Sequence, residues 1–370
     1  MMVILGRIVR MAVTVHMAVT VHMAVTVHMA VTVHMAVTVH MAVTDHMAHM
    51  HHMAHMARMG RMVVMLNGKR FMDLIYIITY KCNLNCTYCP VKKSNLTINK
   101  KIINKSLDLL KNKRIKRIRI FGGEPLIEFI KLQYLVKRIR EIRSNIKILL
   151  TTNGTLLDKN KIDWIEKNKI ILTISLDGNE FTQLKNRKGI NTFQKIISLL
   201  KILPEFTNYN LVIAPNTVKY FLFNFKYLIN LGIRRINLLP AYYTNWSNMQ
   251  LAILEKNFNK ILAYIKKNKI KKRIKLKNLE NYSDLTFFNR ALVVDYDGKI
   301  YNTNAILTKD FFNNKRVFQI GDLNKNLALK KYSKKELITN IKRFANKKNT
   351  EINFILDKVL NNFIYQFKKI

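Results

Sequence analysis

The sequence predicts an α/β protein with a parallel sheet or barrel, followed by a small α+β C-terminal extension. Three observations support this class. Six apolar runs of strand length lie between Leu74 and Pro240, and amphipathic helical runs separate most of them. The connections are short, as in βα units of parallel sheets. Beyond Tyr243 the alternation stops.

The expected elements follow the chain in order. Strands are predicted at 74–80, 115–121, 146–152, 170–176, 210–214 and 236–239. Helices are predicted at 127–143, 159–169, 192–203 and 220–231. The extension should begin with a long helix at 249–267, because apolar residues recur there at helical spacing. A hairpin at 291–307 turns at Asp297-Gly298, and a helix near 335–347 precedes a Lys/Asn-rich tail.

We expect three regions: residues 1–64, a core at 73–243 and the extension at 244–370. Residues 11–46 are six copies of a hexapeptide, five of them Met-Ala-Val-Thr-Val-His. His/Met-rich tracts can bind metals. However, we interpret 1–64 as a translated tandem DNA repeat that is disordered or absent from the native protein. All ten histidines lie in this region, so the rest of the chain has no histidine ligand or base.

The net charge of +42 suggests a polyanionic partner such as nucleic acid. The lysines are spread over nearly every segment rather than gathered in one patch, and Lys, Asn and Ile all have A/T-rich codons. Coding bias is therefore the favoured explanation, and a nucleic-acid partner is not favoured. The chain has no run of 18 strongly apolar residues and no convincing signal peptide, so we expect a cytoplasmic protein without a membrane span.

The three cysteines of the chain stand together as Cys82, Cys86 and Cys89, directly after the first predicted strand. Such clustering is not a disulfide framework and indicates a metal or redox role. Structural zinc takes four closed Cys or His ligands, and the region after the repeat offers only these three. An iron–sulfur cluster with three protein ligands fits better, because one iron stays open for another ligand.

Three further motifs follow the next predicted strands. The second strand is followed by Gly-Gly-Glu-Pro at 122–125, the third by Asn153-Gly154, and the fourth ends in Ser-Leu-Asp-Gly at 175–178. Each motif alone is also a plain turn signal. Because parallel strands end at one edge of a sheet, the motifs should meet the cysteines there.

This constellation resembles the radical S-adenosylmethionine (radical SAM) superfamily over roughly residues 73–243. The resemblance implies a partial (β/α)6 TIM-like barrel. It implies that Cys82, Cys86 and Cys89 bind one [4Fe-4S] cluster, and that S-adenosyl-L-methionine chelates the fourth iron. The cluster then cleaves this cosubstrate reductively to a 5′-deoxyadenosyl radical, which abstracts a substrate hydrogen.

The resemblance also assigns cofactor-binding residues. Tyr88 would pack near the adenine, and the methionyl amine would meet Gly122, Gly123 and Glu124. The remaining candidates would contact the ribose, the carboxylate or the substrate: Asn153, Ser175 and Asp177. Asp177 is the one candidate catalytic residue among them.

Within the superfamily, the chain resembles peptide and sulfatase maturases that carry a SPASM or twitch extension. An auxiliary-cluster cysteine would be expected soon after Tyr301, where this chain has Asn302, Thr303 and Asn304. The absence of cysteine beyond Cys89 excludes a cysteine-ligated auxiliary cluster. The expected partners are a peptide or protein substrate and an electron donor such as ferredoxin or flavodoxin. The alternatives are an RNA-modifying radical SAM enzyme and a decayed, noncatalytic homologue.

Overall fold

The computed structural model describes residues 72–189, 191–280, 290–325, 329–330 and 333–370. They belong to one compact unit, Lys69–Ile370. The repeat predicted at 1–64 lies outside the described residues.

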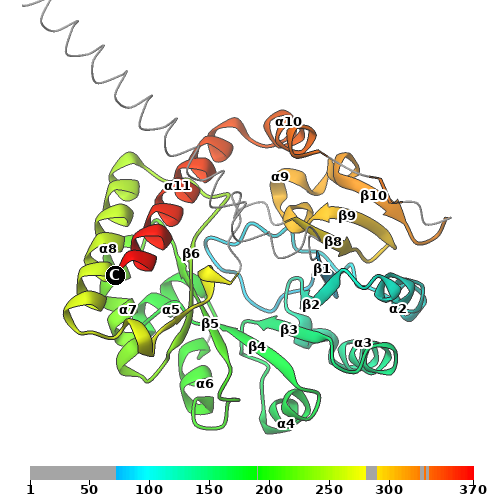
Figure 1. Cartoon of the computed structure of the whole chain (residues 1–370), viewed down its shortest axis with the longest axis horizontal. Helices are drawn as coiled ribbons and strands as arrows, with labels where there is room; N and C mark the ends of the chain where they lie inside the picture. The colour runs from blue at the N-terminus through cyan, green and yellow to red at the C-terminus, as the bar shows by residue number, and fades with distance from the viewer. Residues whose placement is uncertain (1–71, 190, 281–289, 326–328, 331–332) are drawn as a thin grey trace, which may run out of the picture. The chain divides into compact units, whose positions relative to one another are not determined.

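One sheet organises this unit, in the order β10-β9-β8-β1-β2-β3-β4-β5-β6-β7. All neighbouring strands from β8 through β1 to β7 pair in parallel, whereas β8–β9 and β9–β10 pair antiparallel. The strands are β1 Met72–Ile77, β2 Ile115–Phe121, β3 Lys147–Thr152, β4 Ile170–Ser175, β5 Asn208–Ile213, β6 Arg235–Pro240, β7 Lys275–Leu276, β8 Arg290–Val294, β9 Lys299–Thr303 and β10 Gln319–Asp322. Figure 1 shows the strands β1 to β6 curving around a common centre, with helices outside them.

Helices connect the parallel strands and complete the extension. The helices before β6 are α2 Lys100–Ser106, α3 Phe129–Ile142, α4 Lys159–Lys167, α5 Glu180–Arg187, α6 Thr192–Leu199 and α7 Phe221–Asn230. The later helices are α8 Asn248–Lys267, α9 Lys309–Phe312, α10 Lys334–Phe344 and α11 Lys347–Lys369. Short 3-10 turns include η2 Pro125–Glu128, η3 Val218–Tyr220 and η6 Asn304–Leu307.

Side-chain caps fix where several of these helices begin. Asp158 accepts a hydrogen bond from the Lys161 amide at the start of α4, and Asn179 does the same for α5. At α8, Ser247 and Gln250 form a reciprocal capping box. These caps satisfy amides that the first helical turn leaves without partners. The alternation of helices and strands is therefore encoded locally as well as by packing.

Two hydrophobic clusters stabilise the sheet on its opposite faces. The larger one lies between the helices and the outer face of the strands, and includes Leu74 and Tyr76 of β1. The smaller one includes Ile75 and Ile77 of β1, and packs these against the extension, including Phe311. Both faces of β1 are buried, which explains why its sequence is apolar without alternation. We call the face opposite the helices the inner face.

The parallel α/β prediction is confirmed, and predicted strand 115–121 matches β2 residue for residue. Several elements were missed, among them the helix α2 and the short strands β7 and β10. The Lys/Asn-rich tail is largely the helix α11, and the segment after Asp177 contains α5. The sheet also continues across position 243, because β7 and β8 extend it on both sides. The boundary between core and extension stays a prediction, and the extension shares the sheet of the core.

Candidate metal and cofactor site

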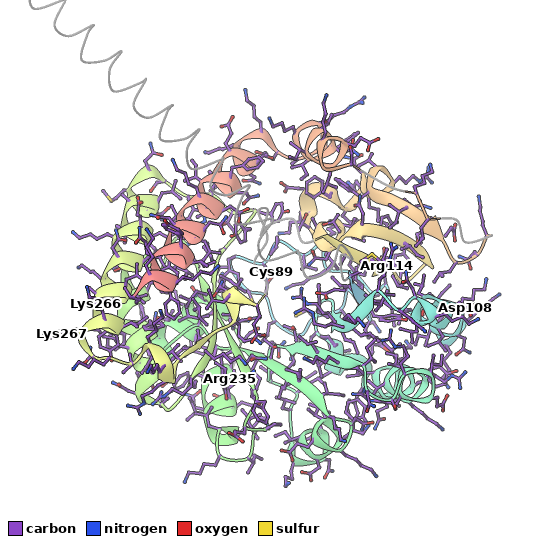
Figure 2. The ribbon with its side chains drawn as sticks, in the orientation of Figure 1. Cys89, Asp108, Arg114, Arg235, Lys266 and Lys267 are labelled. Carbon is purple, nitrogen blue, oxygen red and sulfur yellow. The ribbon has the colours of Figure 1, made fainter. Side chains whose placement is uncertain are left out.

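The three cysteines lie in the loop that leaves β1 at the carboxyl edge of the sheet. All three are half-buried and free of disulfides. Figure 2 shows Cys89 inside the curve of the strands, near its centre. The Cys89 amide donates to the Cys86 carbonyl at 3.2 Å, which makes a turn between these two residues. The loop therefore presents its thiols at the edge where the strand-end motifs lie.

The thiols are near enough to influence one another electrostatically. Burial raises the pKa of Cys82, and raises the pKa of Cys86 to about 11, with Cys89 adding to both. Among the described residues, no three His, Cys, Asp or Glu side chains converge closely enough for a single metal ion. A cluster spreads its ligands over several irons, so it takes thiolates that lie further apart than those of one zinc ion. The donor set fits an iron–sulfur cluster.

Both ends of the cysteine loop are held by backbone hydrogen bonds. Before the cysteines, the Thr79 and Lys81 carbonyls accept from Gly123 and Glu124 at 2.8 and 2.7 Å. After them, the Lys92 amide donates to Leu307 at 2.8 Å, so the extension holds the far end. The core and the extension together fix the position of the thiols.

Gly122 and Gly123 allow this contact because they have no side chain. A Cβ added at Gly122 would lie 2.2 Å from the Thr79 carbonyl oxygen, and one at Gly123 would lie 2.0 Å from that of Lys81. Both distances are far inside van der Waals contact. The backbone of the cysteine loop therefore occupies the space that a side chain at either glycine would need. Contact with the methionyl amine stays a prediction for these residues.

Glu124 is fully buried and joins two strand ends. One carboxylate oxygen accepts from the Leu126 amide at 3.0 Å and from the Thr152 hydroxyl at 2.7 Å. The other accepts from the Asn153 amide at 2.7 Å. Burial raises the pKa of Glu124, and these hydrogen bonds oppose that shift. In this structure Glu124 holds the end of β3 beside the turn after β2, and its predicted cofactor contact stays untested.

Asn153 extends this connection to the cysteine loop. Its side-chain amide donates to the Asn83 side chain at 2.9 Å, and its carbonyl oxygen accepts from the Thr155 amide at 2.9 Å. Asn83 in turn donates to the Thr155 hydroxyl at 2.9 Å. Asn153 is therefore placed beside the cysteines, as the sequence predicted, and its own amide already has protein partners.

Asp177 is the centre of a buried polar network after β4. Its carboxylate accepts from Arg187 at 2.8 Å and from the hydroxyl of Tyr88 at 2.8 Å. It also accepts from the Asn186 side chain at 3.3 Å and the Val212 amide at 3.2 Å. Four donors surround a carboxylate with no exposed surface. The contacts give Asp177 a positioning role, and its predicted catalytic role stays a prediction.

Tyr88 and Ser175 are the two remaining predicted site residues near Asp177. Tyr88 is half-buried, and its hydroxyl is held by Asp177 while the Arg187 guanidinium lies 5.6 Å from its ring centre. Burial raises the pKa of Tyr88 well above its ordinary value. Ser175 is half-buried on the inner face at the end of β4, and its hydroxyl has no hydrogen-bond partner among the described residues. The structure therefore brings all the predicted strand-end residues to one edge of the sheet.

The family model for the radical SAM superfamily matches residues 76–238, which is the segment that carries the cysteine loop and all these strand ends. An uncharacterised protein of Methanocaldococcus jannaschii is 30% identical over 244 residues, which cover 61% of this chain and 83% of that protein. The chain belongs to the radical SAM superfamily.

Two characterised relatives have different activities. A cysteine-type anaerobic sulfatase-maturating enzyme of Clostridium perfringens is 26% identical over 242 residues, 59% of this chain and 62% of the enzyme. A GTP 3′,8-cyclase of the same species is 31% identical over 216 residues, 53% of this chain and 65% of the cyclase. The chain thus spans less than two thirds of either enzyme.

Among solved structures, anSMEcpe with bound AdoMet and Cp18Cys peptide superposes with a TM-score of 0.56 at 21% identity. The match covers 76% of this chain and 83% of that one. It confirms the partial TIM-like barrel fold. Radical SAM proteins bind a [4Fe-4S] cluster and S-adenosylmethionine, and these are the cofactors of this chain.

The sequence missed Arg187 as part of the radical SAM site. It lies on α5, is 5% exposed, and its Nε has no hydrogen-bond partner in the described structure. Burial, the largest single effect, lowers the pKa of Arg187, but Asp177, Tyr88 and Cys86 together raise it above its ordinary value. A signal was present: Asn179 is a good N-cap, Glu180 suits the first turn, and Lys185 and Arg187 suit the last.

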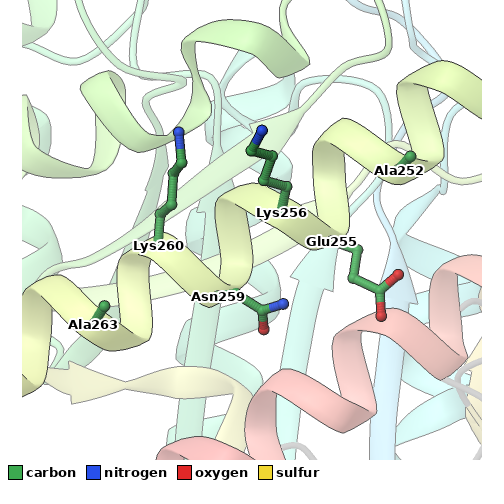
Figure 3. A pocket seen from close by; sticks show the side chains of 6 residues that line it. All are labelled: Ala252, Glu255, Lys256, Asn259, Lys260 and Ala263. Carbon is green, nitrogen blue, oxygen red and sulfur yellow. The ribbon is translucent and has the colours of Figure 1, made fainter.

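Elsewhere on the radical SAM fold, a shallow depression lies along α8 (Figure 3). All its lining residues come from that helix: Ala252, Glu255, Lys256, Asn259, Lys260 and Ala263. It contains none of the cofactor-site residues. No described helix is long and apolar enough to span a membrane.

Proposed function

We propose that this chain is a radical SAM enzyme that abstracts a hydrogen from a side chain of a peptide or protein. Cys82, Cys86 and Cys89 would hold the [4Fe-4S] cluster, with its remaining iron open to S-adenosylmethionine. The observation that carries the proposal is the position of the three thiols, at the edge of the sheet where the other strand ends meet. The bound cluster and cosubstrate would supply a 5′-deoxyadenosyl radical for hydrogen abstraction.

The residues of the chain would orient the cofactors and the substrate rather than exchange protons. Glu124 and Asp177, the acidic groups near the cysteines, already accept hydrogen bonds from the protein. Rigid positioning suits such chemistry, because geometry decides which C–H bond a reactive species attacks. The inner-face positions Thr173 and Ser175, which are half-buried, are available for substrate contacts.

A peptide or protein substrate is supported by resemblance to maturases. The sulfatase-maturating relative and the peptide-bound anSMEcpe structure both match most of the core. The 31% identity to GTP 3′,8-cyclase supports a nucleotide substrate as the competing assignment. An acidic electron donor such as ferredoxin or flavodoxin fits the positive charge of the chain.

The extension supports a maturase with only one cluster. The hydroxyl of Tyr80, two residues before Cys82, donates to Asp295 at 3.0 Å, and Lys315 lies 2.6 Å from the same carboxylate. The Lys315 ammonium also lies 4.7 Å from the ring centre of Tyr296. Burial raises the pKa of Asp295, and Lys315 opposes that shift. This buried ionic and aromatic cluster joins the extension to β1 without cysteine ligands.

Anaerobic reconstitution with iron and sulfide tests the proposal. We expect a reducible cluster with about four irons per chain, and release of 5′-deoxyadenosine when reductant and S-adenosylmethionine are added. Candidate peptides encoded beside the gene, and separately GTP, should be incubated and their mass compared before and after. A mass change confined to a peptide would support the assignment.

The matched variants are Cys86→Ala, which should lose both cluster and cleavage, and Ser94→Ala in the same loop, which should keep them. A change in GTP and not in any peptide would replace the peptide assignment by the nucleotide one. An intact, reducible cluster that never cleaves S-adenosylmethionine, with or without candidate substrates, would leave a noncatalytic homologue.

A further inference from the structure

Arg119 is a cation on the inner face of β2 whose ion pair, at 3.7 Å, is with a carboxylate that a second arginine also binds. Residues Arg117, Arg119 and Phe121 alternate with Ile118 and Ile120, which pack under the helices. The register places Arg119 beside Ile75 of β1 and Leu149 of β3, so its immediate strand neighbours are apolar. The side chain of Arg119 is 23% exposed, which leaves part of it accessible from the inner face.

The nearest carboxylate is already used by another arginine. Asp73 accepts from both Nε and a terminal nitrogen of Arg117, at 2.8 and 2.9 Å. This is the bidentate geometry that an arginine forms with one carboxylate. Arg119 is 3.7 Å from Asp73, too far for a hydrogen bond. In the described parts of the chain, the Arg119 guanidinium has no hydrogen-bond partner.

Among the described residues, the side chains of Arg117, Arg119 and Asp73 together carry one net positive charge. The strands β2, β3, β4, β5 and β6 contain no Asp or Glu to offset it. Burial lowers the pKa of Arg119, with Arg117 adding to the shift and Asp73 opposing it. A half-buried guanidinium with free donors in such surroundings favours an incoming anion.

The position of Arg119 relates this charge to the reaction site. It precedes Gly122 by three residues on an extended strand, which is a distance of about 10 Å. Gly122 and Gly123 contact the cysteine loop directly. An anion held by Arg119 would therefore lie on the inner face, near the edge of the sheet where the cofactors would bind. One substrate residue and its neighbours could span the distance between the two.

We propose that Arg119 binds a carboxylate of the substrate, such as an Asp or Glu side chain of the peptide, and so sets which residue faces the cofactors. This inference rests on the proposed function for its substrate class. A single carboxylate matches the single net charge of the Asp73–Arg117–Arg119 cluster, whereas a nucleoside triphosphate would bring several negative charges to it. The guanidinium of Arg119 recognises the charge and position of the substrate carboxylate and takes no part in the chemical step.

Binding to the full-length, reconstituted protein in the presence of S-adenosylmethionine tests this. The probes are N-acetylated, C-amidated Gly-Glu-Gly and Gly-Gln-Gly peptides, with GTP as a third ligand, measured by titration calorimetry. We expect the Glu peptide to bind about tenfold more tightly than the Gln peptide, the effect of one charge-assisted hydrogen-bonded pair. In Arg119→Gln this ratio should fall to about one, and Arg119→Lys should retain part of it.

Two further variants sharpen the result. Arg114→Gln removes an equal charge from an exposed position before β2, and should leave the ratio unchanged. Asp73→Asn releases Arg117, and should raise the ratio several-fold. An unchanged ratio in Arg119→Gln, or no preference for the Glu peptide in the native protein, would overturn the proposal. The proposal would also be overturned if GTP bound tightly and only GTP binding, not peptide binding, depended on Arg119. Arg119 would then be assigned to a phosphate.

These titrations need no turnover, so their failure is distinct from failure of the proposed function. An Arg119-dependent preference for the Glu peptide, in a protein that never cleaves S-adenosylmethionine, would keep the carboxylate site and reject the activity. Cleavage of S-adenosylmethionine, together with an unaltered preference for the Glu peptide in Arg119→Gln, would keep the activity and reject the carboxylate site.

Discussion

At the residue scale, the buried pair of Asp177 and Arg187 decides how the site is held together. Arg187 comes from α5, Asp177 follows β4, and Tyr88 belongs to the cysteine loop. The end of β4, the following helix α5 and the distant cysteine loop therefore depend on one carboxylate. Removing one partner of such a buried pair leaves the other charge without compensation. The stability lost in this way exceeds the net stability that the intact pair contributes.

We expect Asp177→Asn to lower the free energy of unfolding by about 3–5 kcal/mol, because Arg187 stays buried without its anion. The double variant Asp177→Asn with Arg187→Met removes both charges and should recover much of that loss. Chemical denaturation measures both. Cluster content and 5′-deoxyadenosine release distinguish the roles: a stable double variant with cleavage restored would reject a catalytic Asp177, whereas a stable, cluster-loaded, inactive one would support it.

At the element scale, the turn after β2 positions the cysteine loop through its glycines. Gly123→Ala should prevent the contact with Lys81, since the added Cβ would lie 2.0 Å from a backbone oxygen that cannot rotate away. We expect loss of most cluster iron after reconstitution, measured by iron content and by the visible absorption of the cluster.

Gly232→Ala is the matched control for this change. An added Cβ there meets nothing within 4 Å, although the positive φ of +85° carries its own strain. That strain should cost about 1–2 kcal/mol of stability and leave cluster content intact. If Gly123→Ala also kept its full cluster, the backbone contact would not be what positions the thiols.

Local pattern predicted the strands of the core well, because their signals are short and self-contained. The alternating apolar residues of β2 and the glycines after it could be recognised without knowledge of any partner. Arg187 could not be assigned to the site in this way, since its role depends on how α5 packs beside Asp177 and the cysteine loop. Arg119 is similar. The sequence shows a charged residue in a strand, and only the structure shows that Asp73 forms its hydrogen bonds with Arg117 and a longer ion pair with Arg119.

The extension shows a second limit of local reasoning. The turn pair Asp297-Gly298 predicted a hairpin, and β8 and β9 confirm it. No local pattern indicated that β8 would pair in parallel with β1. That pairing connects segments more than 200 residues apart and depends on the burial of both faces of β1. It makes the extension part of the sheet that carries the cysteine loop.

At the scale of the whole molecule, the question is how much of the chain the cofactor site needs. The unit Lys69–Ile370 contains both hydrophobic clusters, the complete sheet and every predicted site residue. A unit with its own core and satisfied backbone is expected to fold by itself. Residues 1–64 contain all ten histidines, and they lie outside the described residues.

Deletion of residues 1–64 should therefore leave the fold and the cluster intact. The shortened and full-length proteins should give the same melting temperature, iron content and yield of 5′-deoxyadenosine, because the described residues that hold the cysteine loop suffice to position it. A second variant with the repeat histidines changed to Gln separates metal binding by the tract from any effect of its length. Loss of cluster in both variants would show that the histidines supply iron to the site. Loss in the deletion alone would show that the segment itself is required for folding.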